Sequence, residues 1–234
     1  MVDCKGNCLH AGFIVSKRIL MNLLPKFYSA RKKPMKELWN WERCKAKICS
    51  LKGRLGFPED SVLRFLGLSL HLEDGSVHDD LTNCPLKHEY RTLSDIYCIL
   101  SYYADAEPVP AASNLITSKQ LQGGQYCNVM VGRAKSTILD VFGSWSKSLV
   151  DCARILGGSE VNVGYGDHSV GINSLPLVRL TIVLSEEDSE FPASAQIFFD
   201  ESITNYLELE QIGMISELTA SRLKQAYQCL HEER

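Results

Sequence analysis

The chain has 234 residues, of which 45% are hydrophobic and 23% are charged, so it fits a large globular domain and excludes disordered and fibrous classes. Its formal net charge of -3 at pH 7 gives no general attraction to nucleic acid or to an anionic membrane. No stretch approaches the ~20 apolar residues of a membrane span, and no secretory signal pattern begins the chain. The sequence therefore predicts a cytoplasmic protein with no nucleic-acid or membrane partner.

The first part of the chain differs from the rest. Residues 1–34 hold a weak helical pattern that ends at Pro25, followed by the basic run Arg31-Lys32-Lys33 and by Pro34. Met35 is a second candidate start. We expect residues 1–34 to be an appendage or a mis-annotated start, and residues 35–234 to form one domain.

The first half of that domain reads as mainly helical. A helix is expected over 35–51, and apolar spacing predicts another over 92–103. Alternation over 66–72 predicts a strand, with a turn at Asp74-Gly75 and a return strand near Val77. A long helical region is expected over 124–156, punctuated at Gly132 and Gly143.

The last third reads as strands and one helix. A glycine-interrupted strand pair is expected over 161–171, and strands over 177–184 and 193–199 enclose an acidic loop. In the first of these two strands Arg179 and Thr181 alternate with apolar residues. A final helix is expected over 209–230. Helices first and strands later indicate an α+β fold, with a helical N-terminal half packed on a small, mainly antiparallel sheet and closed by a C-terminal helix.

The motifs of common enzyme sites are missing from the sequence. Nine scattered cysteines fit a reducing and even an anaerobic setting, and no Cys-x2-Cys pair is present, so no metal site is predicted. There is no phosphate-binding lysine loop, no Gly-x-Gly-x-x-Gly after a strand and no Gly-x-Ser-x-Gly elbow.

Three features are candidates for ligand contacts. Gly123-Gly124 and Tyr126 stand before a helical region, where backbone N–H groups can bind an anion; the alternative is a plain turn and helix start. Asp167-His168 can form an acid–base pair or a metal site, although neighbours on a strand point to opposite faces. His168 with Gly171 partly matches the corrinoid-ligand motif Asp-x-His-x-x-Gly, but the aspartate is one position too close.

A carboxylate pair is a further candidate. Glu190 and Asp200 flank the strand over 193–199, and two carboxylates can bind a divalent ion or act as acid and base. The structural alternative is that Asp200 caps the turn that begins at Ser202.

Several segments follow one another in a characteristic order: Leu93-Ser94-Asp95-Ile96, Ile116 to Tyr126, Arg133, Phe142-Gly143, Leu156-Gly157-Gly158, Asp167 and Asp188 to Asp200. Taken together, they resemble domain-of-unknown-function family 3786. The resemblance implies a setting in anaerobic bacteria and archaea, where some members carry an added four-cysteine iron–sulfur domain like that of corrinoid iron–sulfur proteins. This chain lacks the four-cysteine domain. The resemblance therefore suggests the metabolic pathway in which the chain acts, but it does not imply that the chain binds an iron–sulfur cluster.

Three hypotheses follow. The first is an accessory, ligand-binding domain of anaerobic metabolism that handles a corrinoid or other tetrapyrrole, or docks on a corrinoid or iron–sulfur protein. Its pocket would be lined by Gly123, Gly124, Tyr126, Arg133 and the segment of Asp167 and His168, with Arg133 binding acidic groups. The second is a metal-dependent enzyme that uses Glu190, Asp200 and Asp167. The third is a structural partner-binding domain. The sequence does not decide among them, and it identifies neither the cofactor nor the oligomeric state.

Overall fold

A computed structural model describes residues 39–86 and 90–232 of the chain. The chain divides into two units, Met1–Met35 and Lys36–Arg234. The segment that we expected to be an appendage lies outside the described residues, so that expectation stays a prediction.

The N-terminal part of the second unit is a helix followed by a small antiparallel sheet. Helix α3 (Trp41–Cys49) begins at Asn40, whose side chain accepts a hydrogen bond of 3.1 Å from the Arg43 backbone N–H. The sheet has the order β1-β2-β3-β4, in a simple meander. Its strands are β1 (Val62–Phe65), β2 (Leu68–His71), β3 (Val77–Asp79) and β4 (Cys84–Pro85).

The β1–β2 turn explains where the sequence prediction was wrong. Leu66 and Gly67 connect the two strands and have φ angles of 51° and 66°. Two consecutive positive φ angles are typical of the tight hairpin turn that matches the twist of its strands. The strand expected over 66–72 therefore begins at Leu68, and the preceding strand β1 was not predicted.

A second, five-stranded sheet has the order β5-β9-β8-β7-β6, and all its neighbours pair antiparallel. Its strands are β5 (Leu115–Ile116), β6 (Ser159–Glu160), β7 (His168–Leu175), β8 (Val178–Ser185) and β9 (Ser194–Asp200). The two strands expected near 177–184 and 193–199 are shifted by one residue. Of the strand pair expected over 161–171, residues 168–171 do form the start of β7, which pairs with β6, whereas residues 161–167 form the loop between these two strands.

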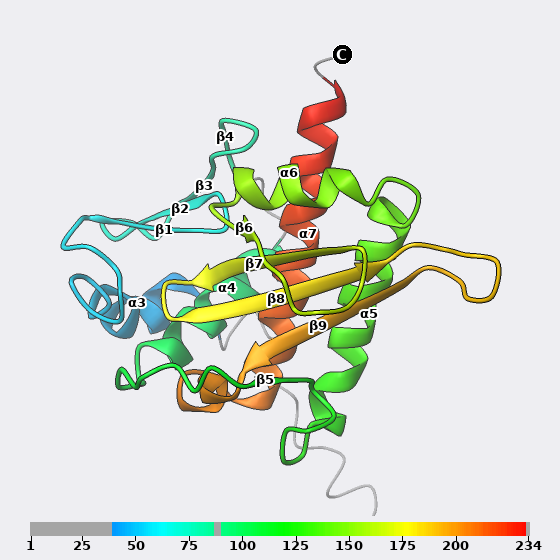
Figure 1. The fold of residues 1–234 in the computed structure, drawn as a ribbon. Helices are drawn as coiled ribbons and strands as arrows, with labels where there is room; N and C mark the ends of the chain where they lie inside the picture. Colours follow the sequence, from blue (N-terminus) through cyan, green and yellow to red (C-terminus); the bar gives the residue numbers. More distant parts are fainter. Residues whose placement is uncertain (1–38, 87–89, 233–234) are drawn as a thin grey trace, which may run out of the picture. The chain divides into compact units, whose positions relative to one another are not determined.

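Four helices complete the fold behind this sheet (Figure 1). They are α4 (Tyr90–Tyr103), α5 (Gln125–Phe142), α6 (Lys147–Ile155) and α7 (Leu209–Glu232), with the short 3-10 helix η1 (Glu201–Asn205) after β9. Helix α7 packs against α4, α5 and α6, while α5 packs on β9 and α6 on β7. The helical region expected over 124–156 ends its first helix at Gly143, as predicted, but Gly132 lies inside α5 and does not interrupt it.

The two faces of the five-stranded sheet differ in burial. On β8, Leu180, Ile182 and Leu184 are fully buried, and they pair with Phe199, Ile197 and Ala195 of β9. Because side chains alternate along a strand, Arg179 and Thr181 lie on the opposite face. One face of the sheet thus carries the core under the helices. On the other face Arg179 is exposed, while Thr181 and Val183 are covered by other parts of the chain.

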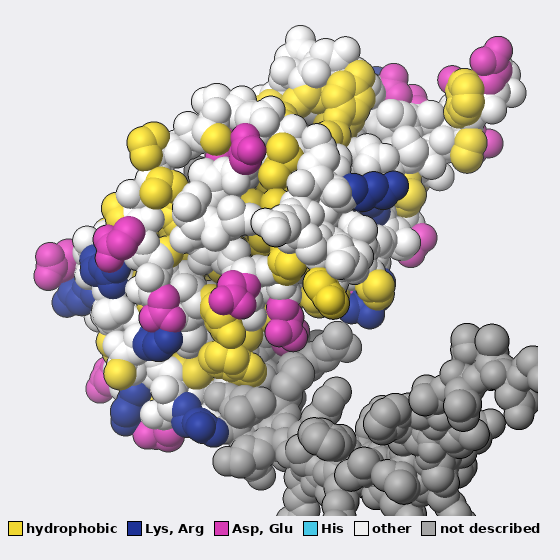
Figure 2. Space-filling view, turned by 90° about the horizontal axis from the view of Figure 1, so that it is seen from below, with side chains coloured by type: hydrophobic (Ala, Val, Ile, Leu, Met, Phe, Trp, Pro, Cys, Tyr) yellow, Lys and Arg dark blue, Asp and Glu magenta, His cyan; other side chains and the backbone are white. Residues whose placement is uncertain are grey.

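The fold is α+β, as the sequence predicts, with a C-terminal helix that closes it. Within the parts of the chain that the structure describes, no helix is long and apolar enough to cross a membrane. Acidic and basic side chains are interspersed on the face shown in Figure 2, where they form no broad field of one sign.

Candidate functional site

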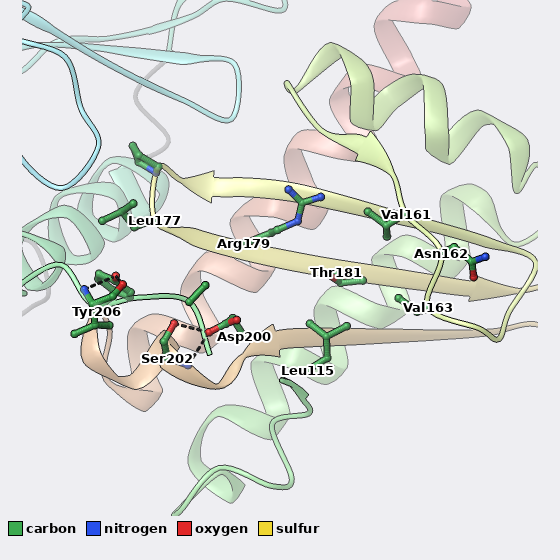
Figure 3. Close-up of a pocket in the computed structure, with 13 residues that line it drawn as sticks. Leu115, Val161, Asn162, Val163, Leu177, Arg179, Thr181, Asp200, Ser202 and Tyr206 are labelled. Carbon is green, nitrogen blue, oxygen red and sulfur yellow. Dashed lines mark hydrogen bonds between the residues drawn. The ribbon is translucent and has the colours of Figure 1, made fainter. Parts of the chain in front are cut away.

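A pocket of about 450 Å³ lies on the face of the five-stranded sheet that the helices leave uncovered (Figure 3). Arg179 and Thr181 of β8 and Asp200 at the end of β9 line it from the sheet. The other lining residues come from the segment before β5, the β6–β7 loop, the β7–β8 turn and η1 with its C-terminal flank: Val109, Ala111, Leu115, Val161, Asn162, Val163, Pro176, Leu177, Ser202 and Tyr206. Apolar side chains form most of this lining.

The β6–β7 loop forms one wall of the pocket. It crosses the front of the sheet in Figure 1, and its two ends bond to strands, through Val161 N–H to the Ser169 carbonyl and Asp167 N–H to the Leu184 carbonyl, both at 2.9 Å. Further along the loop, the ring of Tyr165 meets that of Phe198 on β9 edge to face, with centroids 5.8 Å apart. This contact holds the loop over the sheet.

The segment before β5 forms the opposite wall, and Asp200 holds it. The Asp200 carboxylate accepts hydrogen bonds from the backbone N–H groups of Ala112, at 3.0 Å, and Ser113, at 2.9 Å. It also accepts from the backbone and hydroxyl of Ser202, so it caps η1. Burial raises the pKa of Asp200, but these hydrogen bonds outweigh it and hold the pKa below its usual value.

Tyr206 anchors the same wall further back. Its hydroxyl accepts from the Val109 N–H at 3.0 Å and donates to the Val109 carbonyl at 2.9 Å. The ring itself is buried beside Tyr103. The wall is therefore tied to the fold at both Asp200 and Tyr206.

Among the residues that the structure describes, Arg179 is the only cationic one that lines the pocket. Its guanidinium lies over Gly171 of β7, where an added Cβ would come within 2.6 Å of the Arg179 Cζ. The guanidinium approaches Asn173 Oδ1 and Ser159 Oγ, each at 3.4 Å. Because Gly171 has no side chain, the arginine can lie across the strand.

Arg179 and Asp200 do not pair, although the strand register places them next to each other. Leu180 pairs with Phe199, so the register continued by one residue sets Arg179 opposite Asp200. Residues of opposite charge that lie directly across from each other on one face of a sheet usually attract. Here the arginine turns toward β7 and the carboxylate toward the segment before β5 (Figure 3). Within the described parts of the chain, Arg179 forms no ion pair.

A comparison with protein-family models matches residues 52–222 to the family described as Domain of unknown function (DUF3786). The chain belongs to this family. The searches of curated proteins and of solved structures each found no match. All the residues that line the pocket fall within the matched range.

The six residues that the sequence suggested as ligand contacts do not surround one cavity. Tyr126, Arg133 and Asp167 line three separate pockets, and none of them lines the pocket of Arg179. The single pocket predicted from the sequence is therefore not formed, while a role for each residue at its own position stays a prediction.

Gly123, Gly124 and Tyr126 form a tight turn at the start of α5. A Cβ on Gly124 would overlap the carbonyl oxygen of Ser118, so the close approach is to the chain's own backbone. The N–H groups of Tyr126 and Cys127 already donate to the carbonyls of Gly123 and Gly124. The adjacent pocket also includes Glu201, Glu208 and Glu210. These features match the simple turn and helix start, and the acidic surroundings disfavour an anion there.

Arg133 bonds to Glu217 and thereby links α5 to α7. This hydrogen bond raises the pKa of Arg133. The sequence predicts that the charge of Arg133 binds an acidic group of a ligand. In the structure, Glu217 of the protein pairs with that charge.

Asp167 and His168 point to different surroundings, as their strand position predicts. The Asp167 carboxylate accepts from the Glu186 N–H at 2.7 Å and closes the start of β7 onto the end of β8. His168 is a partner of Leu184 in the register and lies 3.7 Å from Glu186. They do not form an acid–base pair with each other.

The carboxylates of the enzyme hypothesis are also separated. Glu190 precedes β9 and Asp200 ends it, so the length of that strand, roughly 20 Å, lies between them. No group of three or more His, Cys, Asp or Glu side chains within 39–86 and 90–232 is arranged to hold a metal ion. Asp200 caps η1, which confirms the structural alternative.

Sequence reasoning missed the pocket because its parts come from distant segments. Arg179 was visible as an outward position of a predicted strand, beside Thr181. The further signal is Gly171 inside a neighbouring strand, because a strand glycine often marks a place where another group approaches closely. The pairing of these strands was needed to connect the two observations.

Proposed function

We propose that this chain is a small-molecule-binding domain whose ligand occupies the pocket on the open face of the five-stranded sheet. The observation that supports it is a mainly apolar pocket that contains one guanidinium without an ionic partner among the described residues. The volume, about 450 Å³, is within the range of small-molecule sites, and a few placed polar groups in an apolar lining are typical of them.

A corrinoid or another tetrapyrrole is one specific candidate, and anaerobic metabolism is its setting. Both come from the family resemblance rather than from the geometry of the pocket. Acidic side arms of such a ligand would bind Arg179, which replaces Arg133 in the original hypothesis. An accessory role beside a corrinoid or iron–sulfur protein belongs to the same proposal. Anaerobic purification from a cobalamin- and iron-supplemented host, followed by an absorption spectrum, tests this candidate.

A substitution that fills the pocket tests the general proposal. Leu115 lines the pocket and is 41% exposed, so L115W adds bulk there without changing the buried core. Val129 on α5 is 66% exposed and lines none of the pockets described above, which makes V129W a matched control. A thermal-shift screen of cellular metabolites, including cobalamin and haem, is carried out on the wild type and both variants.

We expect ligands that raise the melting temperature of the wild type and V129W but not of L115W, because binding to the native state alone stabilises it. Compounds that stabilise L115W equally well would place the binding site elsewhere. A screen without ligands, together with a native mass spectrum that shows only the bare chain, would contradict small-molecule binding.

A further inference from the structure

We infer that the ligand of this pocket carries a single carboxylate, which binds the guanidinium of Arg179, on a mainly apolar body. This inference rests on the proposed function and adds the chemical class of the ligand. It depends on three features of the pocket: the unpaired charge of Arg179, the groups that hold this side chain in place and the character of the remaining walls.

The charge of Arg179 is available to a ligand. A guanidinium has five N–H donors, and Arg179 directs two of its nitrogens at neutral acceptors, Asn173 and Ser159, each at the long distance of 3.4 Å. The nearest acid in the strand register, Asp200, is occupied by Ala112, Ser113 and Ser202. A carboxylate can therefore form charge-assisted hydrogen bonds with Arg179 without displacing an ion pair of the protein.

The side chain of Arg179 is exposed, and its guanidinium is oriented from below by two long hydrogen bonds and by the space over Gly171. Gly171 leaves space on β7 for its planar group, and Asn173 and Ser159 flank it on β7 and β6. A planar donor group held in one orientation loses less entropy when it binds a planar acid than a free side chain would. Val161 and Val163, on the β6–β7 loop, also line the pocket.

The rest of the pocket selects for one negative charge. Arg179 is the only cation among the described residues that line it, and Asp200 adds a carboxylate on the neighbouring strand. A phosphate monoester carries about -1.5 to -2 charges at pH 7, which one guanidinium does not balance beside an acid. The remaining walls, with Val109, Leu115 and Leu177, suit an apolar body. Thr181, whose hydroxyl forms no hydrogen bond with described residues, offers one more polar contact near the middle of the floor.

The test compares ligands that share a body and differ in the head group. Octanoate, octanamide and octyl phosphate form one series, and indole-3-propionate with its amide forms a second. Binding to the full chain is followed by the NMR shift of the Arg179 Nε–H and by titration, at concentrations up to about 20 mM so that millimolar affinities are detected. We expect each carboxylate to bind about tenfold or more tightly than its amide, as charge-assisted hydrogen bonds predict.

Two variants separate the role of Arg179 from simple loss of folding. R179Q removes the charge, and the preference for carboxylate over amide should fall to about one. G171A keeps the charge but pushes the guanidinium from its place, and it should reduce the preference similarly. The displaced atoms belong to the end of a flexible side chain, so G171A should remain folded. R154Q, on the exposed surface of α6, is the control and should behave as the wild type.

The outcomes distinguish failure of the carboxylate inference from failure of the proposed ligand-binding function. Amides that bind as tightly as carboxylates, a preference that survives in R179Q, or octyl phosphate as the tightest of its series would overturn the carboxylate inference and leave the binding domain intact. No shift of the Arg179 Nε–H with either carboxylate would overturn it as well. If no member of either series perturbs any residue of the pocket and the metabolite screen is also negative, the proposed function itself fails.

Discussion

The buried side chain of Arg222 is fully hydrogen-bonded. It donates from Nε to the Leu66 carbonyl, and from its two terminal nitrogens to the Gly67 carbonyl, Asp79 and Gln225. These bonds use all five of its N–H donors. Arg222 and Asp79 are both buried, so this ion pair connects the four-stranded sheet to α7 from within.

Breaking this pair should destabilise the protein strongly. In D79N the charge of Arg222 stays buried without a partner, and we expect the free energy of unfolding to fall by about 3–5 kcal/mol. Urea unfolding measures the change. The control is D151N, which removes an exposed pair with Arg154 and should cost less than about 1 kcal/mol. If D79N and D151N lowered the free energy of unfolding equally, the strongly stabilising role assigned to the Arg222–Asp79 pair would be wrong.

The same pair predicts an acid dependence. Burial raises the pKa of Asp79, but the hydrogen bonds and charge of Arg222 outweigh it and leave the pKa below 3.8. A lowered native pKa stabilises the folded state above the unfolded pKa, and this contribution is lost as the pH falls through the native value. Between about pH 5 and pH 3, stability should decline more steeply in the wild type than in D79N. Parallel curves in urea titrations at each pH would refute this.

The two glycines of helix α5 show what the sequence can and cannot reveal about one element. In the sequence, Gly124 indicates a turn before the helix or a ligand contact, and Gly132, in the middle of the helix, indicates an interruption. Gly124 is required by the nearby carbonyl of Ser118, whereas a Cβ on Gly132 would meet nothing within 4 Å. Tertiary contacts distinguish them, and such contacts are not encoded in local spacing.

Alanine at these positions should have opposite effects. G132A should raise the free energy of unfolding by about 0.5–1 kcal/mol, because alanine favours a helix interior. G124A should lower it by about 1–3 kcal/mol, because the new methyl group forces the backbone apart. Chemical denaturation of both variants tests the pair, and a stabilising G124A would show that the turn can relax freely.

Strands β8 and β9 were predicted to within one residue because both are rich in β-branched and aromatic residues, and β8 alternates apolar and polar residues from Val178 to Ile182. Strand β6 has only two residues, and the loop after it contains valines that resemble a strand in the sequence. Val161 and Val163 instead line the pocket. The sequence does not show which surroundings an apolar side chain faces, so these two loop valines were assigned to a strand.

Both sheets and the helices contribute to one hydrophobic core among the described residues. Trp39 and Trp41, near the start of this range, pack on Tyr102 and Tyr97 of α4. We therefore expect a chain that begins at Met35 to unfold at the same urea concentration and with the same cooperativity as the full chain. A clear loss of stability on removal of residues 1–34 would contradict the predicted appendage.

At the scale of the molecule the class of the fold was within reach of the sequence, and the candidate site was not. Periodicity is local, so it reports which residues share a face. The pocket, however, joins segments from Val109 to Tyr206 that meet only after the strands have paired. The order β5-β9-β8-β7-β6 brings together the earliest and latest of these strands, and no local pattern determines that order.

The alternation along β8 has a consequence for how such a domain can diversify. Leu180 and Ile182 face the helices, while Arg179 and Thr181 between them face the pocket. Residues that determine stability and residues that determine ligand choice are thus interleaved one by one on a single strand. Substitutions at the exposed position Arg179 can change what is bound with little effect on the interior, whereas Thr181 is itself buried and tolerates fewer changes. Descendants of one ancestral sheet can therefore acquire different ligands while they keep the same scaffold.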